Sequence, residues 1–332
     1  MLPFSFCDLA MTSVIDTLEQ HLLAALDPAP EETRRLFHGR GRCWPGLEQI
    51  TVDWLQGVLL VALFREPPEG QLVELEGMLR RLAGGPRWSG QAIIIQHRYL
   101  PDSPGHWLLG EPSQHRIIDE DGLRYQLDLG LKQNSGLFLD MRYGRRWVRE
   151  QAAGKRVLNL FAYTCGFSVA AIAGGARQVV NLDMSKAALN RGRDNHRLNG
   201  HDLGQVAFLG HELFKSWGKV RKYGPYDLII IDPPTFQKGS FALTQDYARI
   251  LRRLPELLTE GGTVLACVND PAIGPEFLVQ GMAEQAPELG FAERLDNPPE
   301  FPDADPAGGL KALVFRLSRL AAPAPRDTAA RS

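Results

Sequence analysis

The chain has 332 residues, more than one small core requires, and its length suggests about two domains. Hydrophobic residues make up 44% and charged residues 23% of it, as in an ordinary globular protein, and no apolar run is long enough to span a membrane. The formal net charge is −2, so the total charge gives no support for a nucleic-acid partner. Binding to a nucleic acid would require a local basic surface.

The cysteines and the first residues indicate a location. Cys7, Cys43, Cys165 and Cys267 form no C-x-x-C pair and are spread along the chain. We therefore expect reduced thiols rather than a metal site or a disulfide framework. Residues 1–11 are apolar but lack a basic segment, so they do not predict a cleaved signal peptide. These features together favour a cytoplasmic protein.

The first 130 residues mix helical and strand patterns. Apolar residues at helical spacing predict a helix over 12–26 with Thr12 or Ser13 as its cap, and glycines indicate an arginine-rich loop over 34–42. The further elements expected are two strands over 48–64, a helix over 70–83, a buried strand over 92–96, and a hairpin over 115–130. We therefore expect a helical and basic segment, residues 1–44, followed by a small α+β domain, residues 45–130.

From residue 155 onward, short strands alternate with helices. The strands are expected at 156–161, 178–183, 206–209, 228–232 and 263–268, and the helices at 167–174, 185–198, 211–218 and 243–259. This alternation predicts a doubly wound α/β sheet with parallel strands. Only a loop joins the last two strands, 291–295 and 310–317, so they should be antiparallel. This domain is expected to span 131–320, and the tail 321–332 to be disordered.

Two segments of this domain have the pattern of a nucleoside site. Residues 157–168 (VLNLFAYTCGFS) run from a strand through a turn into a helix, where open α/β sheets bind ligands. Only Gly166 stands where glycines cluster in dinucleotide sites, which disfavours pyrophosphate binding. Asp183 closes the next strand, where a carboxylate can accept hydrogen bonds from both ribose hydroxyls. An ordinary turn and a simple helix-entry carboxylate are the alternatives.

The most specific motif is Asp232-Pro233-Pro234-Thr235-Phe236, which follows a buried strand. The adjacent prolines stiffen the loop, and Phe236 can stack on a flat ring. Asp232 and the Pro233 carbonyl can accept hydrogen bonds from an amine or ring N–H and align that nitrogen with a sulfonium methyl group. Such a transfer depends on positioning more than on strong acids or bases. The motif therefore predicts methyl transfer to a planar nitrogen-bearing group, with a plain Pro-Pro turn as the alternative.

In this order the motifs resemble the catalytic domain of bacterial 23S rRNA methyltransferases of the large-subunit family. The matching segments are 133–142 (QNSGLFLDMR), 157–168, 179–200, 226–236 (YDLIIIDPPTF) and 257–270. Residues 45–130 are more weakly similar to the family's central domain, and no N-terminal PUA barrel is evident. The resemblance implies a Rossmann-like class I methyltransferase fold, S-adenosylmethionine (SAM) as cofactor, and 23S rRNA as substrate, with the smaller domain recognising RNA.

The resemblance also implies roles for individual residues. The residues implied to bind the cofactor are Gln133, Phe138, Asp140, Arg142, Phe161, Ala162, Thr164, Gly166, Asp183, Met184, Ser185, His211 and Glu212. Those of the turn would line the methionine part, Asp183 would hold the ribose, and Met184 would pack on the adenine. The segment 133–142 would close over the cofactor. The residues implied to face the target base are Asp232, Pro233 and Phe236.

The chain departs from the family pattern in three respects. Cys165 stands where relatives often have glycine, and His211 and Glu212 stand near a position where relatives carry an acidic residue beside the adenine. The cytosine-5 branch needs a nucleophilic cysteine, and at its position this chain has Asn269. Cys267 would share the strand face of Asn269, but a buried core thiol is the favoured interpretation. The Asp232–Phe236 motif favours the guanine branch of the family, with a purine nitrogen as the methyl acceptor.

Basic residues cluster at 34–42, 142–149 and 215–222, and Tyr143 and Trp147 lie in the second cluster. Such clusters bind phosphates if they share a face, and exposed aromatic rings stack on bases. Solvated helix faces are the alternative. Two other functions stay open: methylation of protein glutamine or a small molecule, and a non-catalytic RNA-binding relative. The oligomeric state is not predicted.

Overall fold

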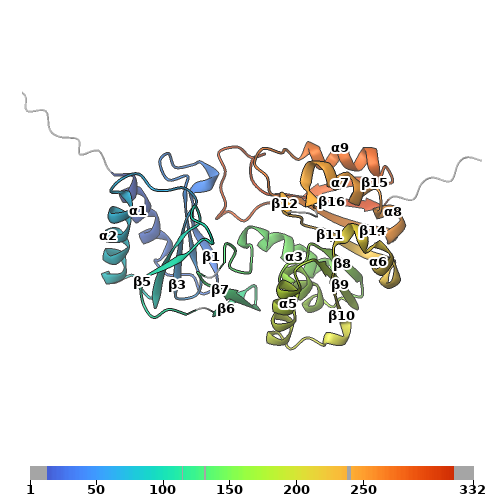
Figure 1. Ribbon diagram of the computed structural model, residues 1–332, viewed down its shortest axis with the longest axis horizontal. Coiled ribbons are helices and arrows are strands. Elements are labelled where there is room, and N and C mark those ends of the chain that lie inside the picture. The colour runs from blue at the N-terminus through green and yellow to red at the C-terminus, as the bar shows by residue number, and fades with distance from the viewer. Residues whose placement is uncertain (1–12, 114, 131, 238–240, 318–332) are drawn as a thin grey trace, which may run out of the picture. The chain divides into compact units, whose positions relative to one another are not determined.

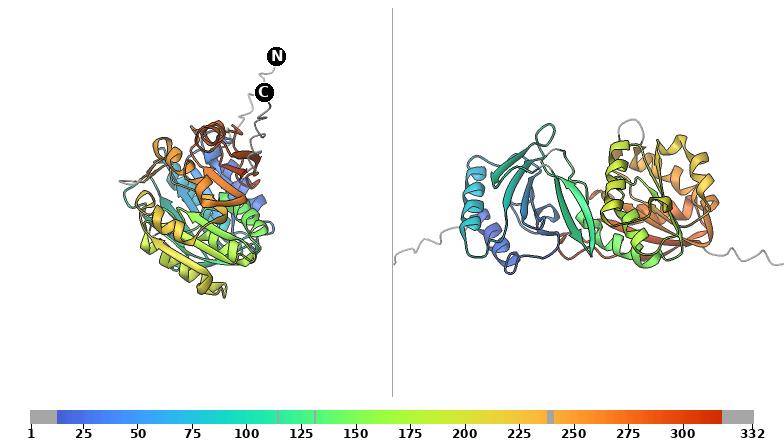
Figure 2. Two further views of the ribbon diagram at one scale, coloured as in Figure 1. Left: turned by 90° about the vertical axis from the view of Figure 1, so that its right-hand side faces the viewer. Right: turned by 90° about the horizontal axis from the view of Figure 1, so that it is seen from below.

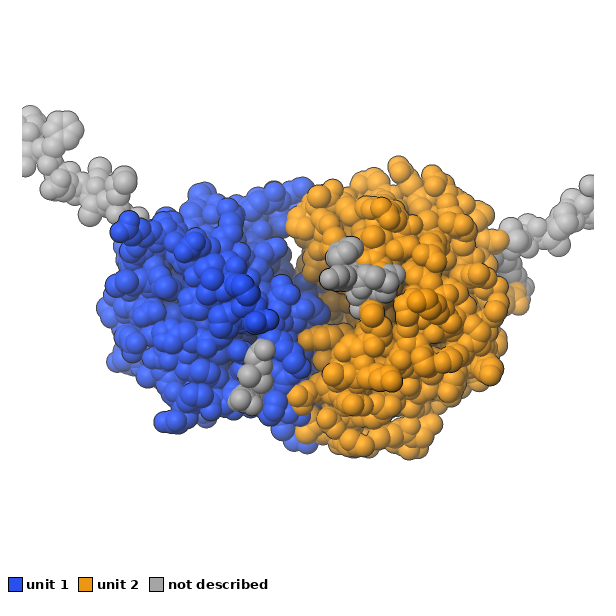
Figure 3. Space-filling view, viewed as in Figure 1, with its two compact units in different colours: residues 1–140, 298–306 blue, residues 141–297, 307–332 orange. Residues whose placement is uncertain are grey.

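The computed structural model describes residues 13–113, 115–130, 132–237 and 241–317, without the side chains of Phe236 and Gln237. Contacts divide the chain into unit 1, residues 1–140 and 298–306, and unit 2, residues 141–297 and 307–332 (Figure 3). The tail predicted at 321–332 lies outside the described residues. Within the described part of the chain, no helix is long and apolar enough to cross a membrane.

Unit 1 is built on a five-stranded sheet in the order β1-β2-β3-β4-β5. Its strands are β1 (Arg34–His38), β2 (Ile50–Trp54), β3 (Val58–Leu63), β4 (Ala92–His97) and β5 (Gly105–Leu109). Helices α1 (Val14–Ala25) and α2 (Gln71–Gly84) lie beside this sheet (Figure 1), and their apolar residues share one core with it. A separate hairpin joins β6 (His115–Glu120) and β7 (Leu123–Asp128), as predicted.

The segment 34–42 of unit 1 differs from its prediction. Its first half is strand β1, not a loop, and only Gly39–Gly41 forms a short 3₁₀ turn. A register shift between Arg35 and Phe37 places a bulge in β1. Because a bulge interrupts the alternation of side chains, Leu36 and Phe37 are both buried. The glycines therefore end the strand instead of preventing it.

Unit 2 contains a seven-stranded sheet in the order β10-β9-β8-β11-β14-β16-β15. The strands are β8 (Arg156–Leu160), β9 (Gln178–Asp183), β10 (Val206–Gly210), β11 (Tyr226–Ile231), β14 (Leu258–Val268), β15 (Leu289–Arg294) and β16 (Lys311–Leu317). The first five in the sheet are parallel, and β16 is antiparallel to both β14 and β15. The predicted doubly wound sheet with an antiparallel end is therefore confirmed.

Helices cover both faces of this sheet (Figure 2). They are α3 (Arg142–Gln151), α4 (Gly166–Ala173), α5 (Lys186–Leu198), α6 (Trp217–Tyr223), α7 (Leu243–Leu251), α8 (Leu254–Leu257) and α9 (Glu276–Gln285). Alternate residues of β8 serve the two cores: Leu158 packs with α7 and α9, and Val157 with α3 and α4. The helix predicted over 243–259 is split, because Pro255 lacks the N–H that a continuous helix needs.

The strand order defines where a ligand should bind. From the central strand β8 the chain proceeds to β9 and β10 on one side, and then to β11 and β14 on the other. The reversal between β8 and β11 is a topological switch point, and ligands of open α/β sheets bind at the carboxyl ends of strands there. The turn after β8, Asp183 and Asp232 all lie at these ends.

Candidate active site

The turn after β8 has an unusual backbone. Phe161, Tyr163 and Cys165 have φ values of 57°, 48° and 64°. Left-handed backbone costs about 1–2 kcal/mol per non-glycine residue, so surrounding structure must hold this turn. Ala162 N donates to the carbonyl of Leu182 in β9 at 3.1 Å. Strained backbone of this kind is typical of ligand sites.

Asp183 holds the turn from the next strand. Its Oδ2 accepts a hydrogen bond from Tyr163 N, and its Oδ1 accepts one from Ser185 N, each at 2.8 Å. Burial raises the pKa of Asp183, and the two amide hydrogen bonds oppose that rise. A carboxylate has about four acceptor positions, so room remains on both oxygens for hydroxyl groups of a ligand. Ser185 caps α5 by accepting from Ala188 N at 3.2 Å.

Helix α5 makes room for the side chain of Cys165. A Cβ atom at Gly192 would lie 2.3 Å from Cys165 Sγ, so only glycine fits at this position of α5. One turn further, Asn195 Nδ2 donates to the Thr164 carbonyl at 3.0 Å. Cys165 is completely buried, and burial raises the pKa of its thiol. The departure from glycine at position 165 is therefore accommodated by Gly192, and the thiol is a packing group.

A buried chain of polar side chains lies behind the turn. Asn159 Nδ2 donates to Asn181 Oδ1, and Asn181 Nδ2 donates to Ser168 Oγ, each at 2.9 Å. Ser168 Oγ lies 2.9 Å from His196 Nε2, within hydrogen-bond distance. Burial, together with nearby His201, lowers the pKa of His196 to about 3, which keeps the ring neutral. These bonds tie β8 and β9 to α4 and α5.

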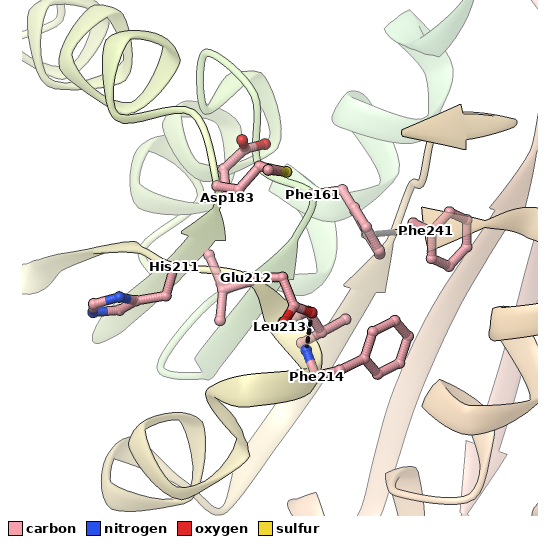
Figure 4. Close-up of a pocket in the computed structure, with 9 residues that line it drawn as sticks. Phe161, Asp183, His211, Glu212, Leu213, Phe214 and Phe241 are labelled. Carbon is pink, nitrogen blue, oxygen red and sulfur yellow. Dashed lines mark hydrogen bonds between the residues drawn. The ribbon is translucent and has the colours of Figure 1, made fainter. Parts of the chain in front are cut away.

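A pocket opens at the carboxyl ends of β8, β9 and β10 (Figure 4). Its lining residues are Phe161, Leu182, Asp183, Met184, His211, Glu212, Leu213, Phe214 and Phe241. Five of these are among the residues predicted to bind the cofactor. The predicted turn residues Ala162, Thr164 and Gly166 follow Phe161 within five residues but are not part of the lining.

Sequence reasoning missed two aromatic residues of the pocket, Phe214 and Phe241. The Phe161 and Phe241 rings meet edge to face with centroids 4.9 Å apart. Phe241 lies in the short strand β13 (Phe241–Ala242) and Phe214 in a 3₁₀ turn (Leu213–Lys215), where a helix over 211–218 was expected. No periodicity in the sequence marks either ring as a site residue, because each reaches the pocket only through the tertiary fold.

His211 and Glu212 occupy the end of β10 but point in different directions. Figure 4 shows the His211 ring directed away from Phe161 and Phe241, and its Nε2 lies 2.7 Å from Lys219 Nζ. The Glu212 carboxylate accepts from Phe214 N at 2.8 Å, which caps the 3₁₀ turn. The Glu212 side chain is thus turned toward Phe214 and the His211 ring toward Lys219.

The Asp232 loop lies one strand further along the sheet. Asp232 follows β11, where Ile231 pairs with Leu160 of β8 on one side and Ala266 of β14 on the other. Asp232 is half-buried and Pro233 is buried. The pairing of β12 (Phe236–Gln237) with β13 closes the loop. The prediction for the Phe236 ring falls on a side chain outside those described.

Several predicted residues lie elsewhere. Gln133, Phe138 and Asp140 belong to unit 1, whereas Arg142 is buried at the start of α3 in unit 2. Their closure over the cofactor stays a prediction. Cys267 is 0% exposed, which confirms the buried thiol, and Asn269 is exposed beyond the end of β14.

The three basic clusters differ in what they contact. In the first, Arg34 and Arg42 form ion pairs with Glu300 and Asp303 of the same unit, at 3.4 and 3.2 Å. In the second, two of the arginines at the start of α3 are buried. The third cluster is exposed, and its Lys215 side chain is 84% accessible. Arg34 and Arg42 of the first cluster are exposed as well, and Lys215 and Arg221 of the third also form ion pairs, with Glu212 at 3.6 Å and Glu256 at 3.7 Å.

The strand order of unit 2, its turn and its carboxylate define the class I SAM-dependent methyltransferase fold. A protein from Streptococcus mutans proposed to be a SAM-dependent methyltransferase shares it with a TM-score of 0.80 and 24% identity, over 91% of this chain and 80% of its own. A Methanocaldococcus jannaschii tRNA m1G37 methyltransferase shares it with a TM-score of 0.59 and 15% identity, over 93% and 79%. The family model for S-adenosylmethionine-dependent methyltransferases matches residues 34–316, and the chain belongs to this family. SAM is its cofactor.

Named relatives are ribosomal RNA enzymes. Ribosomal RNA large subunit methyltransferase I of Aeromonas salmonicida is 37% identical over 216 residues, which cover 62% of this chain and 54% of the relative. The enzyme of the same name from Vibrio cholerae is 28% identical over 269 residues, 77% of this chain and 68% of the relative. The chain spans about half the length of the first of these relatives.

Proposed function

We propose that the protein methylates a nitrogen atom of a purine base, guanine, in 23S ribosomal RNA. The observation that carries the proposal is the order of strand ends: the pocket lies at β8, β9 and β10, and Asp232 and Pro233 follow at β11, next to β8. A methyl donor bound in the pocket would thus lie next to Asp232 and Pro233, whose oxygen atoms can accept hydrogen bonds from the base to be methylated. The rRNA enzymes among the relatives supply the substrate class and favour a cytoplasmic site of action.

The pocket has groups that fit SAM. Asp183 offers acceptor positions for the ribose hydroxyls, and half-exposed Met184 can pack on the adenine. The turn at 161–166 would hold the methionine part, with Ser185 and Glu212 at the adenosine side. When bound, SAM supplies an electrophilic methyl group on a sulfonium.

The residues of the acceptor loop then have positioning roles. The Asp232 carboxylate and the Pro233 carbonyl would accept hydrogen bonds from the target nitrogen and orient its lone pair along the line of transfer. Phe236 would stack on the base. The carboxylate also stabilises the positive charge that develops on the nitrogen before it loses its proton. No strong base is needed for this chemistry.

Burial of the thiols supports nitrogen rather than cytosine carbon as the acceptor. Cytosine-5 methylation needs a thiolate that adds to the ring. Cys165 and Cys267 are both 0% exposed, and position 269 is asparagine. Among the described cysteines the remaining one, Cys43, belongs to unit 1. Unit 2 therefore presents no accessible thiol in its described part.

Nucleoside mass spectrometry of rRNA from a deletion strain tests the proposal. One methylated purine should be lost from 23S rRNA and should return with the wild-type gene. Asp232→Asn should not restore it, whereas the matched variant Asp202→Asn should, because Asp202 caps a short turn at the opposite end of β10. Unchanged methylpurine levels, in cells shown to express the protein, would contradict an rRNA substrate.

A further inference from the structure

A buried lysine in unit 2 is not used by the proposed function. Lys311 is the first residue of β16 and is 0% exposed. A buried ammonium group is costly unless hydrogen bonds compensate it. Lys311 pairs in register with Val268, the last residue of β14. Its Nζ donates to the carbonyl oxygen of Asp270 at 2.6 Å, beyond the end of that strand.

The lysine braces a turn that other hydrogen bonds also fix. The Asp270 carbonyl accepts a second bond from Ile273 N at 3.1 Å, and Asp270 Oδ1 accepts from Ala272 N at 2.9 Å. Three bonds therefore converge on one residue. Asn269 comes directly before this turn and is an exposed residue.

Asn269 lies on the acceptor side of the site. β14 is the parallel neighbour of β11, with Ile231 beside Ala266, so the two strands end at the same edge of the sheet. Asp232 follows β11 directly, and Asn269 follows β14. The sheet order places β8, which ends in the pocket turn, on the other side of β11. A planar acceptor held at Asp232 thus has the pocket on one side and the Asn269 turn on the other.

We propose that Asn269 determines acceptor specificity by hydrogen-bonding the edge of the target base, and that Lys311 is the positioning residue that holds its turn. This inference rests on the proposed function. A carboxamide offers one acceptor oxygen and an NH₂ donor side by side. It therefore complements a purine edge that presents a donor next to an acceptor. A strand-end amide on a fixed turn loses little conformational entropy when it binds such an edge.

Kinetics with an rRNA fragment test the role of Asn269. Asn269→Ala should lower kcat/KM for RNA roughly 10- to 100-fold, the loss expected for one bidentate base contact. The affinity for SAM, measured by calorimetry, should stay within about twofold of wild type, because the pocket lies at other strands. Asn190→Ala, which alters an exposed asparagine of α5, is the matched control and should leave kcat/KM unchanged.

Lys311→Met tests the positioning role, since methionine keeps an unbranched apolar stem and removes the ammonium. It should reproduce the RNA defect of Asn269→Ala with little change in SAM affinity, and combining the two variants should add little further loss. A parallel fall in melting temperature and SAM affinity would instead show that Lys311 supports only the fold. Asn269→Ala with wild-type kcat/KM overturns the inference while the proposed function stands. A wild-type protein that methylates no rRNA overturns both.

Discussion

Replacing Gly192 with alanine tests whether α5 holds the cofactor turn in place. The new Cβ would lie 2.3 Å from Sγ and 2.8 Å from Cβ of Cys165. Because Cys165 is completely buried, its thiol has no open space to enter, and the turn or the helix must move. Overpacking costs about 1–3 kcal/mol, and the better helix propensity of alanine returns up to about 1 kcal/mol. The net loss of stability should therefore approach about 2 kcal/mol.

Urea unfolding and calorimetric titration with SAM measure the two consequences. Displacement of the turn should also weaken SAM binding. The affinity should fall tenfold for each ~1.4 kcal/mol needed to return the turn to its wild-type conformation on binding. Gly218→Ala is the matched control: Gly218 lies in α6, and a Cβ there would meet nothing within 4 Å. This control should be as stable as wild type or slightly more stable.

A double-mutant cycle identifies the partner of the clash. Cys165→Gly removes the thiol and relieves a left-handed non-glycine residue, so Gly192→Ala should cost much less in that background. A coupling of about 1–2 kcal/mol is expected between two residues in contact. Wild-type stability and SAM affinity in Gly192→Ala, or strict additivity in the cycle, would refute this account of the turn.

Three further predictions concern contacts that lie within one unit or the other. Asp183→Ala should weaken SAM binding at least tenfold, because the ribose loses its acceptors. Because the pKa of Asp183 is raised above its ordinary value of 3.8, SAM binding to the wild-type protein should already weaken at a pH above 3.8 as the pH is lowered. Calorimetric titrations of Asp183→Asn should lack this pH dependence. Ser168→Ala leaves the buried His196 Nε2 without its hydrogen-bond partner and should lower stability by about 1–3 kcal/mol in urea unfolding, with a smaller loss arguing against a stabilising role of this polar chain. Arg42→Gln should cost less than about 1 kcal/mol in the same assay, because the Arg42–Asp303 pair is partly solvent-exposed; a larger loss would show that it is a structural clamp.

Local patterns in the sequence predicted the α/β domain well. The strand at Gln178–Asp183 has its predicted bounds, and Ser185 caps the helix that follows, because buried strands and caps depend on neighbouring residues alone. The Asp232 loop was likewise placed at a strand end. Gly192 offered an unused indication: an isolated glycine inside a predicted helix often has a packing reason.

The features that the sequence did not predict depend on distant contacts. Phe241 reaches Phe161 only because the chain folds back through β13. Arg34 and Arg42 resembled a phosphate-binding cluster, but their partners Glu300 and Asp303 come from a segment more than 250 residues later, a separation no local pattern spans. Buried Lys311 could not be distinguished from a surface lysine without the sheet order.

Methyl transfer from labelled SAM to purified rRNA tests the central claim most directly. The wild-type protein should place the label on one purine nitrogen of 23S rRNA, identified by nucleoside mass spectrometry. Asp232→Asn should reduce that transfer by at least about 100-fold while SAM affinity changes little. Label on cytosine carbon, label only on protein or small molecules, or full activity of Asp232→Asn would contradict the account.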